Sequence, residues 1–412
     1  MVNTKSNNLL IKNAHIIDCT QSLYADVYIE NGIISEINKS LIKNCKTIDG
    51  TGFVLMPSFV DMHAHFREPG FTYKEDILSG SMAAVRGGYT AVNLMPNTKP
   101  VISSNKAALY VTNKAKQIGL VAVHQSVSIT KNFDGKDISH LDSLDPSIKV
   151  ITEDGNDVMN SVVMLEAMIK ASKLKIIVMA HCEDKEIAKI DSRLSENIMS
   201  FRNIELAKYA GCHFHLAHIS TKEVMGYVID AKKLGYLITC EVMPHHIALT
   251  DACNYTVNPP LRKADDINSL ISAIKEGWVD VIATDHAPHS KEDKAKGSPG
   301  ISGIETAFAV CFTKLVKQNN ITLNKLSQLM SKKPAEMLGL NKGVISVGFD
   351  GDVVLVNLEK KFSINSNDFV SKGKNTPFEK SSVYGKVVTT IKSGKIVFDN
   401  GNFFGGINND YR

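Results

Sequence analysis

The sequence contains no Cys-x-x-Cys pair, and its seven cysteines are scattered along 412 residues. This arrangement argues against a disulfide framework and against a zinc site built from thiolates, and it favours a reducing compartment. No apolar run approaches the roughly 20 residues needed to span a bilayer. The first eight residues are polar and lack the apolar core of a signal peptide. We therefore expect a cytoplasmic protein without a membrane segment.

Charge of one sign is not concentrated anywhere in the chain. The 47 Lys and Arg residues are interspersed with 43 Asp and Glu residues, so the net charge of +4 forms no basic tract for nucleic acid. A hydrophobic content of 43% and a charged content of 22% are typical of a soluble globular protein. The length allows an α/β barrel, which takes about 250 residues, together with a smaller unit.

Both ends of the chain have the pattern of short β-strands. At the N-terminal end these are residues 9–17, 25–29 and 32–37, with Asn31-Gly32 as a hairpin turn signal between the last two. At the C-terminal end they are residues 352–356, 386–391 and 395–398. We predict a small β-sandwich domain formed by both termini, residues 1–56 together with residues 344–412.

The middle of the chain, residues 57–343, alternates short apolar runs with segments of helical pattern. Eight apolar runs are present, at residues 59–65, 90–95, 120–127, 148–152, 175–181, 212–218, 237–243 and 279–285. Helix-compatible segments lie between them, for example residues 79–86, 105–116, 159–172 and 267–276. This alternation predicts a (β/α)8 barrel of the TIM type, whose chemistry lies at the C-terminal ends of the strands.

Five of the eight runs end in, or lead directly into, histidine or aspartate. Alternation along a strand puts His63 and His65 on the same side, although a lone His-x-His is often structural. So many costly polar side chains at one barrel mouth indicate a metal site. Nitrogen and oxygen donors favour zinc, and six donors suit two ions bridged by a carboxylate. The candidate ligands are His63, His65, Asp154, His181, His218 and Asp285.

Two neighbouring histidines are set apart from these ligands. His213 and His215 share a strand with His218 but have the opposite parity, so we expect them to face away from the barrel interior.

Several motifs together resemble the dihydroorotases of the amidohydrolase superfamily, in the class with a metal-bridging aspartate. They are residues 61–70 (DMHAHFREPG), 73–76 (YKED), 95–98 (MPNT), 258–262 (NPPLR) and 283–289 (ATDHAPH), followed by Lys294. The resemblance implies a zinc-dependent, reversible cyclisation of N-carbamoyl-L-aspartate to L-dihydroorotate in pyrimidine synthesis. It also implies a homodimer as the assembly.

The resemblance also implies a role for each matched residue. His63, His65 and Asp285 would hold one zinc ion, His181 and His218 the other, and Asp154 would bridge them. Asp285 would also move the proton in catalysis. Arg67 and Asn97 would bind the substrate carboxylate, for which a guanidinium is suited by its fork of donors. The residues expected to close around the ring are Asn258, His289, Pro299 and Gly300.

Some alternatives stay open at this point. Glu153 can compete with Asp154 as the bridge, and a carboxylated Lys149 can replace it, as in hydantoinases. The polar segment 290–300 is a candidate lid. One alternative function is a hydantoinase or dihydropyrimidinase, against which Arg67 argues. Another is an inactive scaffold for aspartate transcarbamoylase, but an inactive scaffold has no reason to keep every metal ligand. Aspartate transcarbamoylase is also a possible partner of an active enzyme.

Overall fold

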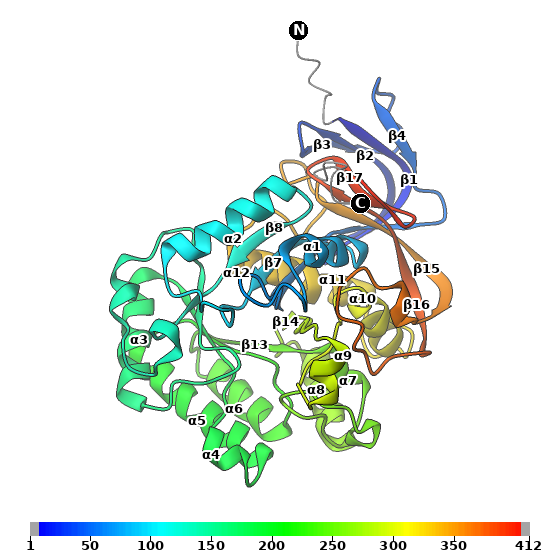
Figure 1. The fold of residues 1–412 in the computed structure, drawn as a ribbon. Coiled ribbons are helices and arrows are strands. Elements are labelled where there is room, and N and C mark those ends of the chain that lie inside the picture. The colour runs from blue at the N-terminus through cyan, green and yellow to red at the C-terminus, as the bar shows by residue number, and fades with distance from the viewer. Residues whose placement is uncertain (1–7, 405–412) are drawn as a thin grey trace.

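The structure is a computed structural model that describes residues 8–404. It has two parts: a sheet built from both ends of the chain and a barrel built from the middle, as the sequence predicts. Figure 1 shows the blue strands of the N-terminal end and the orange and red strands of the C-terminal end together at one side of the barrel.

The terminal sheet joins the two chain ends through one strand. Strand β5 pairs with β1 in parallel and with β15 in antiparallel orientation. The strand order is β18-β17-β16-β15-β5-β1-β2-β3, with β4 paired to β1. The bounds are β1 Leu9–Ile17, β2 Ser22–Glu30, β3 Ile33–Asn38, β4 Lys46–Asp49, β5 Val54–Pro57, β15 Val353–Ser363, β16 Ser382–Lys392, β17 Lys395–Asp399 and β18 Asn402–Phe403.

The sandwich-like sheet has a core of its own. The turn between β2 and β3 is at Asn31-Gly32, as predicted, and both residues have positive φ, 52° and 86°. Buried side chains from both chain ends, such as Ile16, Val27 and Leu355, form one cluster. The division into domains at residues 56/57 and 343/344 stays a prediction, and its outermost residues, 1–7 and 405–412, lie outside the described residues.

The barrel contains all eight predicted strands in the predicted order. The third apolar run is divided by Ser126 into β8 and β9. Parallel pairing links neighbouring strands from β6 to β8 and from β9 to β14, and a bridge from Ala64 to His286 joins the first strand to the segment after the last. The bounds are β6 Phe59–Ala64, β7 Tyr89–Leu94, β8 Ala122–Gln125, β9 Val127–Ser128, β10 Val150–Thr152, β11 Ile177–Ala180, β12 Phe214–Leu216, β13 Ile238–Val242 and β14 Val281–Ile282.

The helices follow the strands and cover the barrel. The four predicted helical segments correspond to α1, α2, α3 and α8. The α-helices are α1 Ile77–Arg86, α2 Asn105–Ile118, α3 Ser161–Leu174, α4 Lys185–Ala188, α5 Ser192–Ala210, α6 Lys222–Lys233, α7 Pro244–Ala248, α8 Ala264–Glu276, α9 Lys291–Ala295, α10 Ala307–Cys311, α11 Leu323–Ser327 and α12 Lys333–Leu338. The remaining helical turns are η1 Lys131–Phe133, η2 Ser139–Ser143, η3 Asp251–Cys253, η4 Phe312–Val316, η5 Gln328–Lys332 and η6 Ser366–Asp368.

Local sequence explains where helix α1 begins and ends. Asp76 caps its N-terminus by accepting a hydrogen bond from the backbone N–H of Ser79, whose side chain completes a capping box, and Gly87 follows its last residue.

The interior of the barrel is apolar at one end and polar at the other. Met62, Ile177 and Met179 from the strands pack with Ala335 and Leu338 of α12. The opposite end, where the strands finish, carries buried histidines and aspartates. Across residues 8–404, no helix combines the length and the apolar character that crossing a membrane requires.

Candidate metal centre and substrate site

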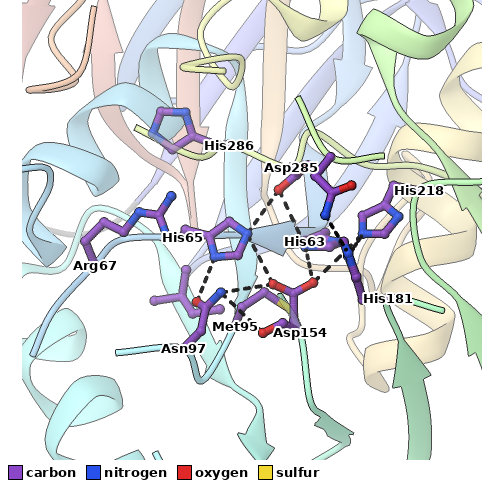
Figure 2. A network of polar contacts seen from close by, with 12 residues as sticks. His63, His65, Arg67, Met95, Asn97, Asp154, His181, His218, Asp285 and His286 are labelled. Atoms are coloured by element: carbon purple, nitrogen blue, oxygen red, sulfur yellow. Dashed lines mark hydrogen bonds and ion pairs between the residues drawn. The ribbon is translucent and has the colours of Figure 1, made fainter. Parts of the chain in front are cut away.

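Six polar side chains converge at the C-terminal end of the barrel strands. His63 is at the end of β6, and His65 follows it; Asp154, His181, His218 and Asp285 follow β10, β11, β12 and β14. All six are at least 92% buried. Figure 2 shows their rings and carboxylates pointing toward one another, whereas His286 lies apart. The structure therefore brings together every residue that the sequence nominated as a metal ligand.

The distances within this cluster are short. His63 Nε2 lies 3.2 Å from Asp154 and 3.6 Å from Asp285, and His65 Nε2 lies 3.0 Å from Asp285 and 3.6 Å from Asp154. His181 Nδ1 and His218 Nε2 are 2.7 Å apart. Two groups have ligand atoms close enough to share one ion: His63, His65 and Asp285, and His63, Asp154 and His218.

The second nitrogen of three imidazoles is held by a partner outside the cluster. His63 Nδ1 bonds to Glu241 at 2.7 Å, His65 Nδ1 to Asn97 at 2.9 Å, and His181 Nε2 to Glu183 at 2.6 Å. Since an oxygen acceptor takes the N–H, the other nitrogen of each ring keeps its lone pair and faces the cluster. Convergent lone pairs beside two carboxylates fit divalent metal ions.

The electrostatics of the cluster keep its carboxylates ionised. Burial raises the pKa of Asp285, but its contact with His65 Nε2 and the neighbouring imidazole of His63 outweigh burial and lower the pKa below its usual value. Asp154 behaves in the same way, with His63 as its strongest counter-charge. Burial and the neighbouring His181 and His63 lower the pKa of His218 to about 3, so its ring is neutral. Metal ions bind ionised carboxylates and neutral imidazoles. Asp154 and Glu241 outweigh burial and raise the pKa of His63 well above its ordinary value, so a metal ion that binds His63 displaces a proton from it.

Sequence reasoning missed the carboxylates that orient these rings. Glu241 is fully buried, and besides His63 it contacts His215 Nε2 at 3.3 Å. Glu241 lies in the seventh apolar run, on the same face of the strand as Thr239 and Met243. A carboxylate within an apolar run is costly to bury without a partner, and this was the signal that could have identified it. Glu183 stands two residues after His181 and carried no comparable signal.

The expectation that His215 faces away from the barrel interior is wrong. His215 pairs with Met179, which packs in the interior, and its ring contacts Glu241. The parity argument fails because β12 ends at Leu216 and His218 has φ 34°, so the backbone leaves the extended conformation before it reaches the ligand.

A cavity of about 230 Å³ opens beside the cluster. All six residues expected to bind substrate line it: Arg67, Asn97, Asn258, His289, Pro299 and Gly300. Both ends of the Asn97 amide also contact ligands, because its oxygen accepts from His65 and its nitrogen donates to Asp154 at 3.1 Å. Asn258 donates to Glu183 at 2.6 Å. The two asparagines thus tie the cavity wall to the cluster.

The segment after β14 lines this cavity through Ser298, Pro299 and Gly300. It contains the short helix α9, and Lys294 bonds to the carbonyl oxygens of Thr256, Ser298 and Gly300. Asn375, from the C-terminal part of the chain, also holds the segment. Its amide donates to the carbonyls of Ala287 and Gly300 and accepts from the backbone N–H of His289. Nothing in the local sequence around Asn375 indicated this contact.

The structure rules out Lys149 as the bridge. Its side chain is exposed, its amine donates to the carbonyl of Pro146, and it lines a different cavity with Leu338 of α12, the helix at the other end of the barrel. Glu153 is turned away from the cluster, because its carboxylate accepts hydrogen bonds from the backbone and side chain of Thr130. Asp154 alone of the three faces the ligands.

Comparison with known proteins places this site in a family. A model of the family described as "Amidohydrolase family" matches residues 54–397, which include the whole barrel and all six clustered residues. The chain belongs to the amidohydrolase family.

Curated relatives within the amidohydrolases match nearly the whole chain. A protein named dihydroorotase from Clostridium botulinum (strain Eklund 17B / Type B) is 52% identical over 394 residues, covering 95% of this chain and 99% of the relative. A dihydroorotase from Bacillus subtilis (strain 168) is 38% identical over 421 residues, covering 95% and 98%.

Solved structures confirm the amidohydrolase fold. An L-hydantoinase from Arthrobacter aurescens superposes with a TM-score of 0.89 at 23% identity, covering 97% of both chains. A dihydropyrimidinase from Brevibacillus agri gives 0.88 at 22% identity, covering 97% of this chain and 96% of that one. At such identities the likeness shows the barrel and its terminal sheet, and it carries no information on substrate.

Proposed function

We propose that this amidohydrolase is a dihydroorotase, which interconverts N-carbamoyl-L-aspartate and L-dihydroorotate in the synthesis of pyrimidine nucleotides. The observation that carries the proposal is the 52% identity over 95% of the chain to a relative of that name. The cavity supports it, because Arg67 supplies a guanidinium for a substrate carboxylate beside the His and Asp cluster.

The metal that fits these donors best is zinc, two ions per chain. His63, His65 and Asp285 would hold one ion, His181 and His218 the other, and Asp154 would bridge. When bound, such ions lower the pKa of a shared water from 15.7 to about 7 and polarise the carbonyl under attack.

The residues of the chain would handle the substrate and the proton. Arg67 would bind the ring carboxylate, and we assign the second contact to His289, whose ring lies 3.3 Å from the guanidinium. Asn97, for which the sequence predicted this role, has both ends of its amide bonded to His65 and Asp154 and would support the wall with Asn258. The Pro299-Gly300 backbone would close over the ring. In hydrolysis, Asp285 would take the proton of the attacking water and deliver it to the leaving ring nitrogen. In cyclisation the same carboxylate would remove the ureido proton. The lowered pKa of Asp285 keeps its carboxylate ionised, which is the state that can accept a proton.

The proposal is tested by following dihydroorotate hydrolysis through its ultraviolet absorbance, with zinc determined on the same sample. Turnover with about two zinc ions per chain is expected. If the protein hydrolyses hydantoin or dihydrouracil and not dihydroorotate, it is a hydantoinase and the proposal is wrong. If the zinc-loaded protein is active only when aspartate transcarbamoylase is added, its activity depends on that partner. A homodimer and a cytoplasmic location stay predictions, the first of which light scattering on the purified protein checks.

A further inference from the structure

His289 lies between two cations that both contact its ring. The amine of Lys74 is 3.3 Å from Nδ1, and the Nη2 of Arg67 is 3.3 Å from Nε2. An ammonium and a guanidinium have only donors, whereas a neutral imidazole has one acceptor and one N–H. Only one of the two contacts can therefore be a hydrogen bond, and the other places two N–H donors face to face.

The ring is neutral at ordinary pH. Burial and the charges of Arg67 and Lys74 lower the pKa of His289 to about 3. A neutral ring must choose a tautomer, and the two sides of the ring differ in what they face. Arg67 and His289 line the substrate cavity, while Lys74, on the Nδ1 side, is paired with Asp293 at 3.3 Å. Two N–H donors, one from Arg67 and one from His289 Nε2, can face each other on the cavity side, because a bound anion can accept a hydrogen bond from both.

We propose that Lys74 is a positioning residue that fixes His289 in the tautomer with its hydrogen on Nε2. Lys74 donates to Nδ1, so the Nε2–H of His289 and the guanidinium of Arg67 converge on one carboxylate oxygen of the substrate. Lys74 belongs to the motif at residues 73–76, to which the resemblance assigned no role.

This arrangement sets specificity as well as affinity. A ring that bears the carboxylate supplies an acceptor to both donors, whereas a neutral cyclic amide leaves them facing each other with no acceptor between. The inference rests on the proposed function, since it names the part of the site that distinguishes dihydroorotate from neutral rings.

Lys74→Met tests the inference, because methionine keeps the unbranched stem and removes the donor. We expect the KM for dihydroorotate to rise about tenfold, with kcat within about twofold and the zinc content unchanged. Lys74→Arg, which restores a donor, should recover most of the affinity. Lys372→Met is the matched control, since it removes a neighbouring lysine that pairs with Asp76.

A spectroscopic measurement tests the tautomer without turnover. In long-range proton–nitrogen spectra of protein labelled with ¹⁵N at histidine, His289→Gln identifies the signals of His289. We expect an unprotonated Nδ1 in the wild type and partial protonation of Nδ1 in Lys74→Met. Hydrogen on Nδ1 in the wild type, an unchanged KM in Lys74→Met, or a failure of Lys74→Arg to recover affinity would each overturn the inference. Absence of wild-type turnover on dihydroorotate would instead reject the proposed function, and the spectrum would still decide the tautomer.

Discussion

Replacing Glu241 by glutamine should weaken zinc binding while leaving the barrel folded. Glu241 is fully buried, and its Oε1 accepts from His63 Nδ1 at 2.7 Å. A hydrogen bond between a charged group and its partner contributes about 1.5 to 3 kcal/mol to stability. Loss of such a partner of a metal ligand typically lowers metal affinity 10- to 100-fold, which is about 1.4 to 2.7 kcal/mol. The two ranges agree, so we expect Glu241→Gln to lower the affinity for zinc 10- to 100-fold.

The assay is competition for zinc against a chromogenic chelator of known affinity, with activity measured at rising zinc concentration. Activity of Glu241→Gln should return when zinc is in excess, because the ligands themselves remain. Asp26→Asn is the control, since Asp26 is a buried carboxylate of the terminal sheet that accepts from the backbone of Asn13 and Leu41. It should lower the unfolding temperature without changing zinc affinity. An unchanged zinc affinity in Glu241→Gln would refute the argument that this carboxylate orients His63.

Four further predictions concern other parts of the molecule. Asp285→Asn should fold normally and lose at least about 100-fold in kcat, and near-normal turnover in a steady-state assay would reject Asp285 as the proton carrier. Lys149→Ala should keep zinc content and kcat within about twofold, whereas loss of both would revive a carboxylated lysine as the bridge. Asn375→Asp removes two donated hydrogen bonds of about 1 kcal/mol each, so KM should rise several-fold at constant zinc content. An unchanged KM would show that substrate binding does not depend on these two hydrogen bonds. Burial lowers the pKa of His213 to about 4, so the unfolded chain takes up its proton first as the pH falls. Stability should therefore drop by at most about 3 kcal/mol between pH 6.5 and 4, and urea titrations of His213→Gln should show a smaller drop than the wild type.

The sequence predicted the barrel and the cluster of candidate ligands because both depend on short-range patterns. Each apolar run ends at the same face of a parallel sheet, so the last polar residue of a run is placed at the mouth regardless of what the helices do. His181 and His218 illustrate this, since neither has a neighbour in sequence among the ligands and both arrive at one cluster. The hairpin at Asn31-Gly32 was predictable for a similar reason, because two residues define it.

Predictions that relied on unbroken strand geometry failed where the strands stop. Parity along β12 placed His215 outside the barrel, yet the strand ends before His218 and the backbone at His218 and Asp285 has positive φ. Such conformations are costly for these residues and persist only because the surrounding structure holds them, so a local pattern cannot reveal them.

The sequence by itself determined the strand ends, the types of side chain at those ends and the family to which the chain belongs. Only the tertiary structure brought together groups that lie far apart in the sequence: Glu241 contacts His63 from 178 residues away, and Lys74 contacts His289 from 215 residues away. It also separated Asp154, which faces the cluster, from Lys149, because the two stand at the two ends of one short strand and therefore at opposite ends of the barrel. The physical reason is that hydrogen-bond partners and tautomers depend on distances of a few tenths of an ångström between distant segments, whereas strand periodicity depends only on neighbours.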